Sequence, residues 1–202
     1  MTTIYLIRHG ENEFVKQNKL AGWLPGVHLN EAGLAQARSL AQRMQNVKLN
    51  AVYASPLERT MQTAEPLAQA QGLDIQVHEG LGEVRIGSWQ GQDLKALRRR
   101  KLWPVIQQTP SLARFPGGES FSEAQARVVD ALEDFRQKHP GKKDAFVCVT
   151  HADVIKMAIA YYLGMPLDMF QRLAVAPASI SSLHFDRRPT LLSLNDTHAQ
   201  HA

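Results

Sequence analysis

Short apolar runs that end in polar residues recur along the chain, and each is typical of a buried β-strand. The pattern predicts strands at residues 4–7, 51–54, 75–78, 145–149, 180–185 and 191–194. Between them, apolar residues recur at intervals of three and four, as on the buried face of an amphipathic helix. This second pattern predicts helices from Asn30 to Met44, from Ser55 to about Gly72, from Ser120 to about Pro140 and from Asp153 to Leu163.

Several of these helices have clear start signals. Asn30 is a favourable N-cap residue, and Ser55 with Glu58 and Ser120 with Glu123 have the spacing of capping boxes. We therefore expect Ser55 and Ser120 to cap helices. The spacing also predicts the buried faces of two helices: Leu34, Ala37, Leu40, Ala41 and Met44 in the first, and Ala126, Val129, Ala131, Leu132 and Phe135 in the third.

Strands that alternate with helices favour an α/β fold in three layers, α/β/α, with a mostly parallel central sheet covered on both faces. One domain is expected over residues 1–195. Residues 92–118 are rich in basic residues and contain Pro104 and Pro110, so we expect an irregular insertion with short helical pieces there. Residues 196–202 are expected to form a disordered tail.

The composition changes this picture little. The 202 residues are 44% apolar and 21% charged, which is ordinary for a globular protein. The net charge of +4 suits an enzyme whose substrate carries phosphate, but it is too mild to indicate nucleic-acid binding. The densest basic run, residues 98–101, is read as a solvated face, with a role at the entrance for an acidic substrate as the alternative.

The compartment is predicted from what the chain lacks. No stretch approaches the roughly 18 consecutive apolar residues of a membrane span, and the first residues do not resemble a signal peptide. The single cysteine, Cys148, lies inside an apolar run and allows neither a disulfide framework nor a cysteine-based metal site. We therefore expect a cytoplasmic protein that does not bind membranes.

Polar residues with catalytic potential follow two of the predicted strands directly. Arg8 and His9 come after the first strand, and His151 follows the strand at 145–149. Ligands of open α/β sheets bind at the carboxyl ends of the strands, so these residues are expected to share one cleft. A solvated loop is the alternative for an isolated Arg-His pair, but an imidazole beside a guanidinium that can grip phosphate is favoured here.

Two further residues extend this candidate site. Arg59 lies near the start of a predicted helix, where free backbone N–H groups already favour an anion, so it is a candidate second phosphate clamp. Glu83 lies in a glycine-rich loop beside the apolar Val84, Ile86 and Trp89, an environment that can raise a carboxyl pKa for general-acid work. Each residue alone is more often solvent-exposed, and it is their combination that favours a site.

Six segments in order give the chain a resemblance to the histidine phosphatase superfamily, also called phosphoglycerate mutase-like. The resemblance covers most of the chain. The segments are residues 6–11 (LIRHGE), 29–33 with Gln36-Ala37, 55–60 (SPLERT) with 62–64, Gly82-Glu83 with 87–91, 116–120 (PGGES) and 149–151 (VTH).

The resemblance implies a covalent mechanism that needs neither a metal nor a cofactor. His9 attacks phosphorus, Glu83 protonates the leaving group and then activates water, and the cationic residues hold the phosphate. The implied catalytic residues are His9, Glu83, Arg8, Arg59 and His151, and the implied substrate-binding residues are Arg8, Asn12, Arg59 and His151. His9 must be neutral to attack, and Arg8 and Arg59 are expected to disfavour its charged form.

Departures from the family pattern bear on the activity. Glycolytic mutases of the family follow the catalytic Glu with Arg-His-Tyr, whereas this chain has Val84-Arg85-Ile86. That weighs against a glycolytic mutase. Asn12 replaces the usual Ser or Thr and can still donate to phosphate, Val15 replaces a usual Asn, and Ala152 replaces a common Gly.

These observations favour a metal-independent phosphomonoesterase that acts through phosphohistidine on a small phosphorylated metabolite. A phosphomutase and a non-catalytic phospho-ligand binding protein are the alternatives. A zinc hydrolase is disfavoured, because the eight histidines lack the spacing of zinc motifs. The expected partner is a small phosphorylated substrate, not nucleic acid, and a homodimer stays open.

Overall fold

The computed structural model describes residues 1–197, which form a single six-stranded sheet flanked by helices. The strand order is β3-β2-β4-β1-β5-β6. Its strands are β1 (Thr2–Arg8), β2 (Ala51–Ala54), β3 (Ile75–Val77), β4 (Asp144–Thr150), β5 (Ile180–Phe185) and β6 (Pro189–Asp196). Strands β3, β2, β4 and β1 are parallel neighbours, whereas β5 and β6 pair antiparallel at one side. The prediction of a mostly parallel sheet is confirmed.

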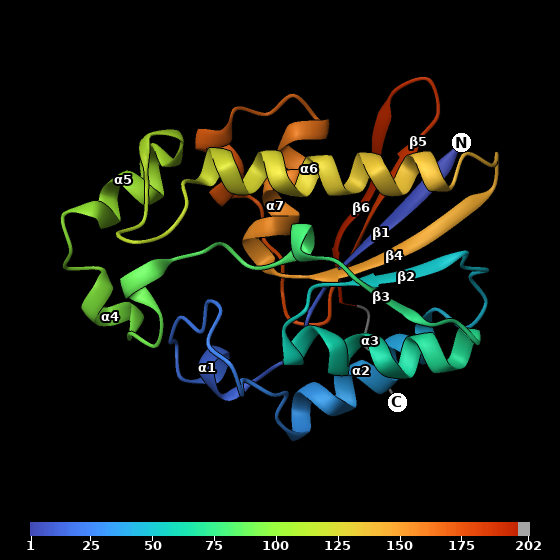
Figure 1. Ribbon diagram of the computed structural model, residues 1–202, viewed down its shortest axis with the longest axis horizontal. Coiled ribbons are helices and arrows are strands. Elements are labelled where there is room, and N and C mark those ends of the chain that lie inside the picture. Colours follow the sequence, from blue (N-terminus) through green and yellow to red (C-terminus); the bar gives the residue numbers. More distant parts are fainter. Residues whose placement is uncertain (198–202) are drawn as a thin grey trace.

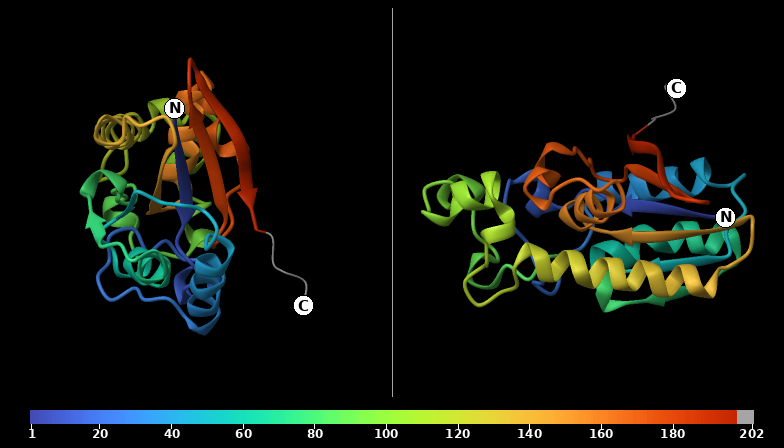
Figure 2. Two further views of the ribbon diagram at one scale, coloured as in Figure 1. Left: turned by 90° about the vertical axis from the view of Figure 1, so that its right-hand side faces the viewer. Right: turned by 90° about the horizontal axis from the view of Figure 1, so that it is seen from above.

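Helices cover both faces of the sheet and form the outer layers (Figures 1 and 2). On one face lie α2 (Glu31–Arg43) and α3 (Glu58–Gln71), and on the other α6 (Phe121–Lys138) and α7 (Ala152–Tyr162). Each face has its own core. The core under α6 and α7 includes Phe135 and Phe146, and the core under α2 and α3 includes Leu40 and Val147. Alternate residues of β4, such as Phe146 and Val147, thus serve opposite layers, as the pleat requires.

Short elements connect these layers at the carboxyl ends of the strands. They are α1 (Glu13–Lys16), η1 (Glu79–Leu81), η2 (Gly87–Trp89), α4 (Leu94–Leu97), α5 (Leu102–Gln108), η3 (Pro110–Leu112) and η4 (Leu167–Arg172). The segment 92–118 contains α4, α5 and η3, and its apolar side chains, including Phe115, pack into a third core with Phe121. This segment projects beyond the sheet at one end of the molecule (Figure 1).

The helix starts agree with the sequence prediction in two places and differ in one. Asn30 caps α2, and Ser120 forms a complete capping box with Glu123 at α6. The predicted capping box at Ser55 is wrong, because α3 begins only at Glu58 and no side chain caps it. The Ser55 hydroxyl is instead hydrogen-bonded to His151, so a tertiary contact prevails over the local capping signal.

Two residues predicted to face the core are exposed. Leu34 in α2 is 39% exposed, and Ala126 in α6 is also exposed. Val129, Ala131, Leu132 and Phe135 are buried as predicted, and Phe121, Ala124 and Val128 extend the buried face of α6. At the other end of the chain, Asp196 ends β6 rather than beginning a tail, and residues 198–202 of the predicted tail lie outside the described residues.

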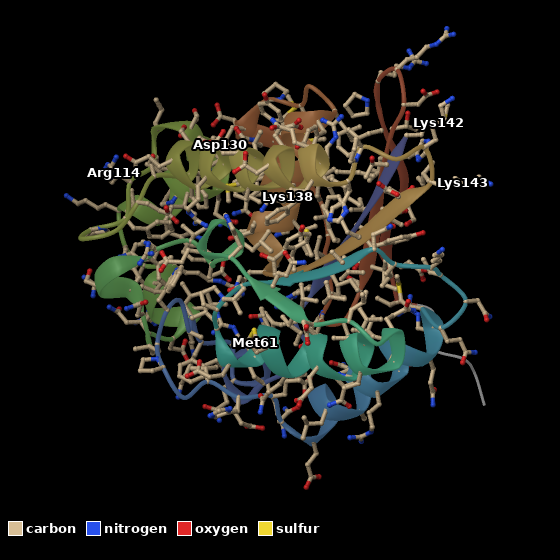
Figure 3. The ribbon with its side chains drawn as sticks, turned by 45° about the vertical axis from the view of Figure 1, so that its right-hand side comes forward. Met61, Arg114, Asp130, Lys138, Lys142 and Lys143 are labelled. Atoms are coloured by element: carbon tan, nitrogen blue, oxygen red, sulfur yellow. The ribbon has the colours of Figure 1, made fainter. Side chains whose placement is uncertain are left out.

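Basic residues are distributed over both ends of the molecule. Arg114 lies next to η3, whereas Lys142 and Lys143 lie in the loop before β4, at the opposite end (Figure 3). Lys143 is exposed and far from the carboxyl ends of β1 and β4, where His9 and His151 follow. It therefore provides a site for control substitutions.

Candidate active site

One polar residue follows each of three neighbouring parallel strands, at the edge of the sheet where these strands end. Ser55 follows β2, His151 follows β4 and His9 follows β1. The backbone N–H of His9 donates to the carbonyl of Thr150 at 3.0 Å, and that of Ser55 donates to the carbonyl of Val149 at 3.0 Å. Because the strand pairing continues to these residues, their positions are fixed by the sheet itself.

The two histidines predicted to share a cleft do so. The ring centroids of His9 and His151 lie 5.3 Å apart, at an interplanar angle of 62°. Nδ1 of His9 is 2.7 Å from the carbonyl oxygen of Gly10. A carbonyl only accepts hydrogen bonds, so Nδ1 carries the hydrogen and Nε2 of His9 keeps a free lone pair. His9 is 4% exposed and therefore has little rotational freedom.

Close backbone packing holds the loop that carries His9. A Cβ atom on Gly10 would lie 2.8 Å from the carbonyl oxygen of Gly33, and one on Gly33 would lie 2.0 Å from that of Glu11. Neither position can accept a side chain without movement of the backbone. The backbone of the first turn of α2 therefore contacts the backbone of residues 10 and 11 directly. This close approach requires glycine at positions 10 and 33.

Buried nitrogen atoms without partners converge on this edge. In residues 1–197, the buried side-chain nitrogens that lack a hydrogen-bond partner include Arg8 Nε, Asn12 Nδ2 and Arg59 Nη1. Asn12 is 1% exposed and Arg59 is 1% exposed. Unpaired buried donors are costly, and buried guanidinium groups especially so. Together they form a site prepared for an anion with several oxygens.

Other atoms of the same side chains are firmly anchored. Arg8 Nη1 donates to the carbonyl of Val175 at 2.7 Å, and Arg59 Nη2 donates to the carbonyl of Gly22 at 2.8 Å. Asn12 Oδ1 accepts from the backbone N–H of Val15 at 2.9 Å and so caps α1. These anchors orient the free nitrogens without neutralising the positive charge.

His151 is held between three polar side chains. Its Nε2 lies 2.9 Å from the hydroxyl of Ser55, and its Nδ1 lies 3.4 Å from Arg59 Nη2 and 3.6 Å from Glu83 Oε2. Ser55 is the residue of this cluster that the sequence prediction missed as a site residue. The available signal was its position directly after a buried strand, which matches the positions of His9 and His151.

Glu83 is placed by contacts to its backbone. Its carbonyl accepts hydrogen bonds from Trp23 Nε1 at 2.5 Å and from Arg127 Nη2 at 3.4 Å. Arg127, on α6, also donates to the carbonyls of Gly80 and Gly82, each at 3.0 Å. The sequence prediction included neither Trp23 nor Arg127, because each reaches the loop from a distant segment.

Burial gives the ionisable groups unusual pKa values. Burial and the nearby carboxylate of Asp153 raise the pKa of Glu83 to about 7, against the opposing effect of Arg59. Burial, followed by the charges of Arg59 and Arg8, holds the pKa of His9 well below its usual range. The sequence-based expectation named only the arginines, and burial is the larger cause. A neutral His9 and a carboxyl group that is partly protonated near neutral pH thus lie in one cluster.

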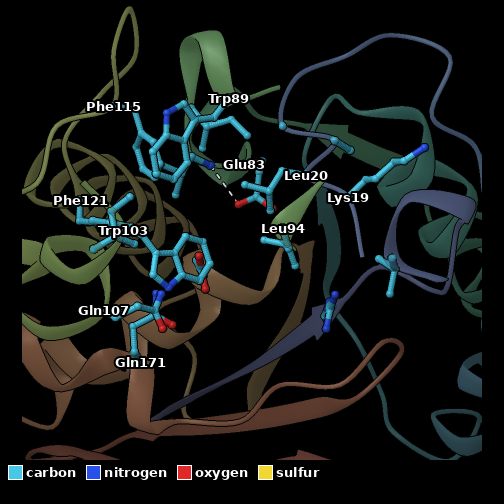
Figure 4. A pocket seen from close by; sticks show the side chains of 18 of the residues that line it. Lys19, Leu20, Glu83, Trp89, Leu94, Trp103, Gln107, Phe115, Phe121 and Gln171 are labelled. Atoms are coloured by element: carbon cyan, nitrogen blue, oxygen red, sulfur yellow. Dashed lines mark hydrogen bonds between the residues drawn. The ribbon is translucent and has the colours of Figure 1, made fainter. Parts of the chain in front are cut away.

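A pocket of about 310 Å³ opens onto this cluster. Arg8, His9, Asn12 and Glu83 line its inner end. Its outer part is lined by apolar side chains, several of them aromatic (Figure 4). Trp103 is among the lining residues, whereas residues 98–101 are exposed and are not. The basic run therefore lies outside the pocket, in agreement with a solvated face.

Over residues 1–197, no cluster of three or more His, Cys, Asp or Glu side chains has an arrangement that could hold a metal ion. In the same part of the chain, no helix is long and apolar enough to cross a membrane.

Comparison with known proteins identifies the family. The model of the histidine phosphatase superfamily (branch 1) matches residues 4–197. The chain belongs to this superfamily. Among curated relatives of this histidine phosphatase, phosphoserine phosphatase 1 of Hydrogenobacter thermophilus is 30% identical, over 98% of this chain and 93% of the relative.

Further relatives show a second named activity and the same fold. A probable phosphoglycerate mutase, GpmB of Photorhabdus laumondii, is 31% identical over 96% of this chain and 89% of the relative. The solved structure of YhfR from Bacillus stearothermophilus superposes with a TM-score of 0.90, at 27% identity and 98% coverage of both chains. The phosphoglycerate mutase-like α/β fold predicted from the sequence is thus confirmed.

Proposed function

We propose that this histidine phosphatase is a metal-independent phosphomonoesterase that acts on a small phosphorylated metabolite through a phosphohistidine on His9. The observation that carries the proposal is the set of buried, unpartnered donors on Arg8, Asn12 and Arg59 beside the free Nε2 of His9. A phosphate group would supply the missing acceptors. The fixed positive charge would stabilise its transferring oxygens, which is the task that Mg²⁺ performs in many other phosphoryl-transfer enzymes.

The first step is an in-line transfer. The lone pair on Nε2 of His9 forms the P–N bond while the bond between phosphorus and the ester oxygen breaks. The leaving oxygen receives the proton of Glu83, whose pKa of about 7 keeps part of the enzyme in the protonated form at neutral pH. Arg8, Arg59 and His151 hold the non-bridging oxygens. The products of this step are the free alcohol, phosphohistidine and the carboxylate of Glu83.

The second step reverses these roles. The Glu83 carboxylate takes a proton from water, and the resulting hydroxide forms the new P–O bond as the P–N bond breaks. Inorganic phosphate, neutral His9 and protonated Glu83 are regenerated. No electron carrier or second substrate is needed, so the proposed cycle involves no cofactor.

A direct test measures phosphate release from para-nitrophenyl phosphate by the wild-type enzyme and by His9→Ala. The proposal expects turnover by the wild type and none by the variant. His28→Ala is a matched control, because His28 is exposed and absent from the pocket lining. Equal turnover by wild type and His9→Ala would refute the proposal.

A phosphomutase is the second candidate, and the likeness to a probable phosphoglycerate mutase favours it. The two activities differ in whether water or a second substrate hydroxyl takes the phosphoryl group. Product analysis with and without an added bisphosphate separates them. Release of inorganic phosphate that is independent of the bisphosphate supports the phosphatase, whereas isomerised phosphoester supports the mutase.

The cellular setting is part of the proposal. Cys148 is a free thiol and completely buried, which agrees with a chain that does not depend on oxidation. We infer a cytoplasmic enzyme whose partner is its small phosphorylated substrate. Phosphatase activity in the cytoplasmic fraction of the source cells, lost on deletion of the gene, tests this location.

A further inference from the structure

The pocket changes character between its inner and outer parts. The inner end carries the donors for a phosphate, whereas the outer part is built from apolar side chains on several segments. We propose that the alcohol portion of the substrate is uncharged and bulky, with an aromatic ring as its best occupant. This inference rests on the proposed phosphatase function and specifies its substrate class.

Aromatic side chains form one wall of the outer pocket. Trp89 of η2 and Trp103 of α5 lie with their ring planes within 12° of parallel and their centroids 6.4 Å apart. Phe115 meets Trp89 edge to face at 5.4 Å, and Phe121 meets Phe115 at 5.4 Å. Figure 4 shows these rings gathered on one side of the pocket. Such a wall offers stacking and edge contacts to a planar group.

Aliphatic side chains complete the outer pocket. Leu20, Val84, Ile86 and Leu94 line it together with the rings. Val84 and Ile86 follow Glu83 closely in the chain, so apolar surface lies beside the carboxyl group at the inner end of the pocket. Each large apolar group that leaves water here contributes favourably to binding.

The charged groups that line the outer pocket are not arranged to receive a substrate carboxylate or amine. Lys19 is exposed, and in Figure 4 its ammonium group points away from the aromatic rings. The Asp153 carboxylate already lies 3.2 Å from the ammonium of Lys156. The other polar side chains of the outer lining, Gln107 and Gln171, are uncharged. A substrate such as phosphoserine or phosphoglycerate would therefore place its charges there without a partner of opposite charge, at a cost in binding.

The test compares phosphate esters with alkoxide leaving groups, so that differences in leaving-group strength stay small. Ethyl phosphate, 2-phenylethyl phosphate and O-phosphoserine differ in the ring and in the charges. The inference expects kcat/KM for 2-phenylethyl phosphate to exceed that for ethyl phosphate by roughly tenfold or more, as burial of a phenyl group would give. O-phosphoserine is expected to be turned over more slowly than 2-phenylethyl phosphate.

Substitutions of residues that line the pocket test whether the preference for an aromatic substrate arises there. Trp103→Ala is expected to raise KM for 2-phenylethyl phosphate by about fivefold or more. The KM for ethyl phosphate is expected to change by less than about twofold. Gln107→Lys adds a cation at an exposed lining position and tests the charge argument without removing a packed ring. It is expected to raise kcat/KM for O-phosphoserine relative to kcat/KM for 2-phenylethyl phosphate. Leu112→Ala is the control, because this side chain is 78% exposed and lies outside the pocket lining. It is expected to leave the relative kcat/KM values of the three esters unchanged.

The outcomes separate this inference from the proposed function. If para-nitrophenyl phosphate is hydrolysed but O-phosphoserine is preferred over 2-phenylethyl phosphate, the phosphatase stands and the inference is overturned. If no phosphoester is hydrolysed, the proposed function fails, and calorimetric titration with 2-phenylethylphosphonate and ethylphosphonate still measures the contribution of the ring. Tighter binding of the phenyl compound supports the inference, and equal binding overturns it.

Discussion

The hydroxyl of Ser55 lies 2.9 Å from Nε2 of His151 and can accept the hydrogen of that ring nitrogen. Arg59 Nη2, which can only donate, lies 3.4 Å from Nδ1 of the same ring, so Nδ1 keeps its lone pair and the hydrogen is on Nε2. The Ser55 hydroxyl therefore favours one tautomer and one orientation of the His151 ring. Ser55 is in this sense a positioning residue for His151.

Ser55→Ala is accordingly expected to lower kcat by about tenfold, as loss of one oriented hydrogen bond in a buried site would, with little change in KM. ¹⁵N chemical shifts of the His151 ring report the tautomer directly. We expect one tautomer in the wild type and a mixture in the variant. A drop in activity with an unchanged tautomer would show that Ser55 acts only through packing.

Arg127 links α6 to the backbone of the loop that carries Glu83. Arg127→Met keeps the bulk of the side chain and removes the hydrogen bonds to the carbonyls of Gly80 and Gly82. We expect kcat to fall about tenfold or more on alkyl phosphates and distinctly less on para-nitrophenyl phosphate, since only the former needs a well-placed acid. Lys143→Ala should match the wild type on both. Equal losses on both substrates with Arg127→Met would exclude a role through Glu83.

Glu83→Gln tests the acid itself by its leaving-group dependence. Activity on alkyl phosphates should fall by about a hundredfold or more, and activity on para-nitrophenyl phosphate much less, because nitrophenolate hardly needs protonation. Rates are measured for both substrates at the same pH. Parallel losses would remove Glu83 from the role of acid.

The raised pKa of Glu83 also predicts that the effect of Glu83→Gln on the stability of the fold depends on pH. The pKa of Glu83 in the folded protein, about 7, exceeds its ordinary value of 4.5, so the folded state binds the proton more tightly than the unfolded state. Glu83 therefore disfavours folding increasingly as pH rises from 4.5 to 7. Urea unfolding should show Glu83→Gln to be more stable than the wild type by roughly 1 to 3 kcal/mol at pH 8 and nearly equal at pH 4. A constant difference across this range would contradict the raised pKa.

Chelators and vanadate test whether guanidinium groups replace a metal. Activity on para-nitrophenyl phosphate should persist in excess chelator and be blocked by vanadate, which can occupy the site of the transferring phosphoryl group. Assays after extended dialysis against chelator measure this. Loss of activity that zinc or magnesium restores would contradict the proposed mechanism.

Much of the fold follows from local patterns. The strand that ends at Arg8 and the one that ends at Thr150 have apolar centres, at residues 4–7 and 145–149, and pair directly, which brings His9 and His151 together as predicted. Ser120 and Glu123 form their capping box as predicted, with the Ser120 side chain bonded to the backbone at the start of its own helix. The local signals therefore suffice where tertiary contacts agree with them.

The remaining features depend on tertiary contacts that no local pattern contains. Ser55 has the capping signature but bonds to His151, which is 96 residues away in the sequence. Arg127 and Trp23 reach the Glu83 loop from separate segments. The apolar pocket likewise forms only when α5 packs beside η2 and brings Trp103 next to Trp89. Such partners become visible only in the folded chain.

The phosphoenzyme is the most direct test of the covalent mechanism. A P–N bond is labile in acid, so the wild-type enzyme is mixed with substrate and quenched in alkali before digestion and mass spectrometry. The mechanism predicts one added phosphoryl group on the peptide that contains His9, present in wild type and His28→Ala and absent from His9→Ala. Phosphate on His151 instead, or no phosphoenzyme on any residue during confirmed turnover, would contradict it.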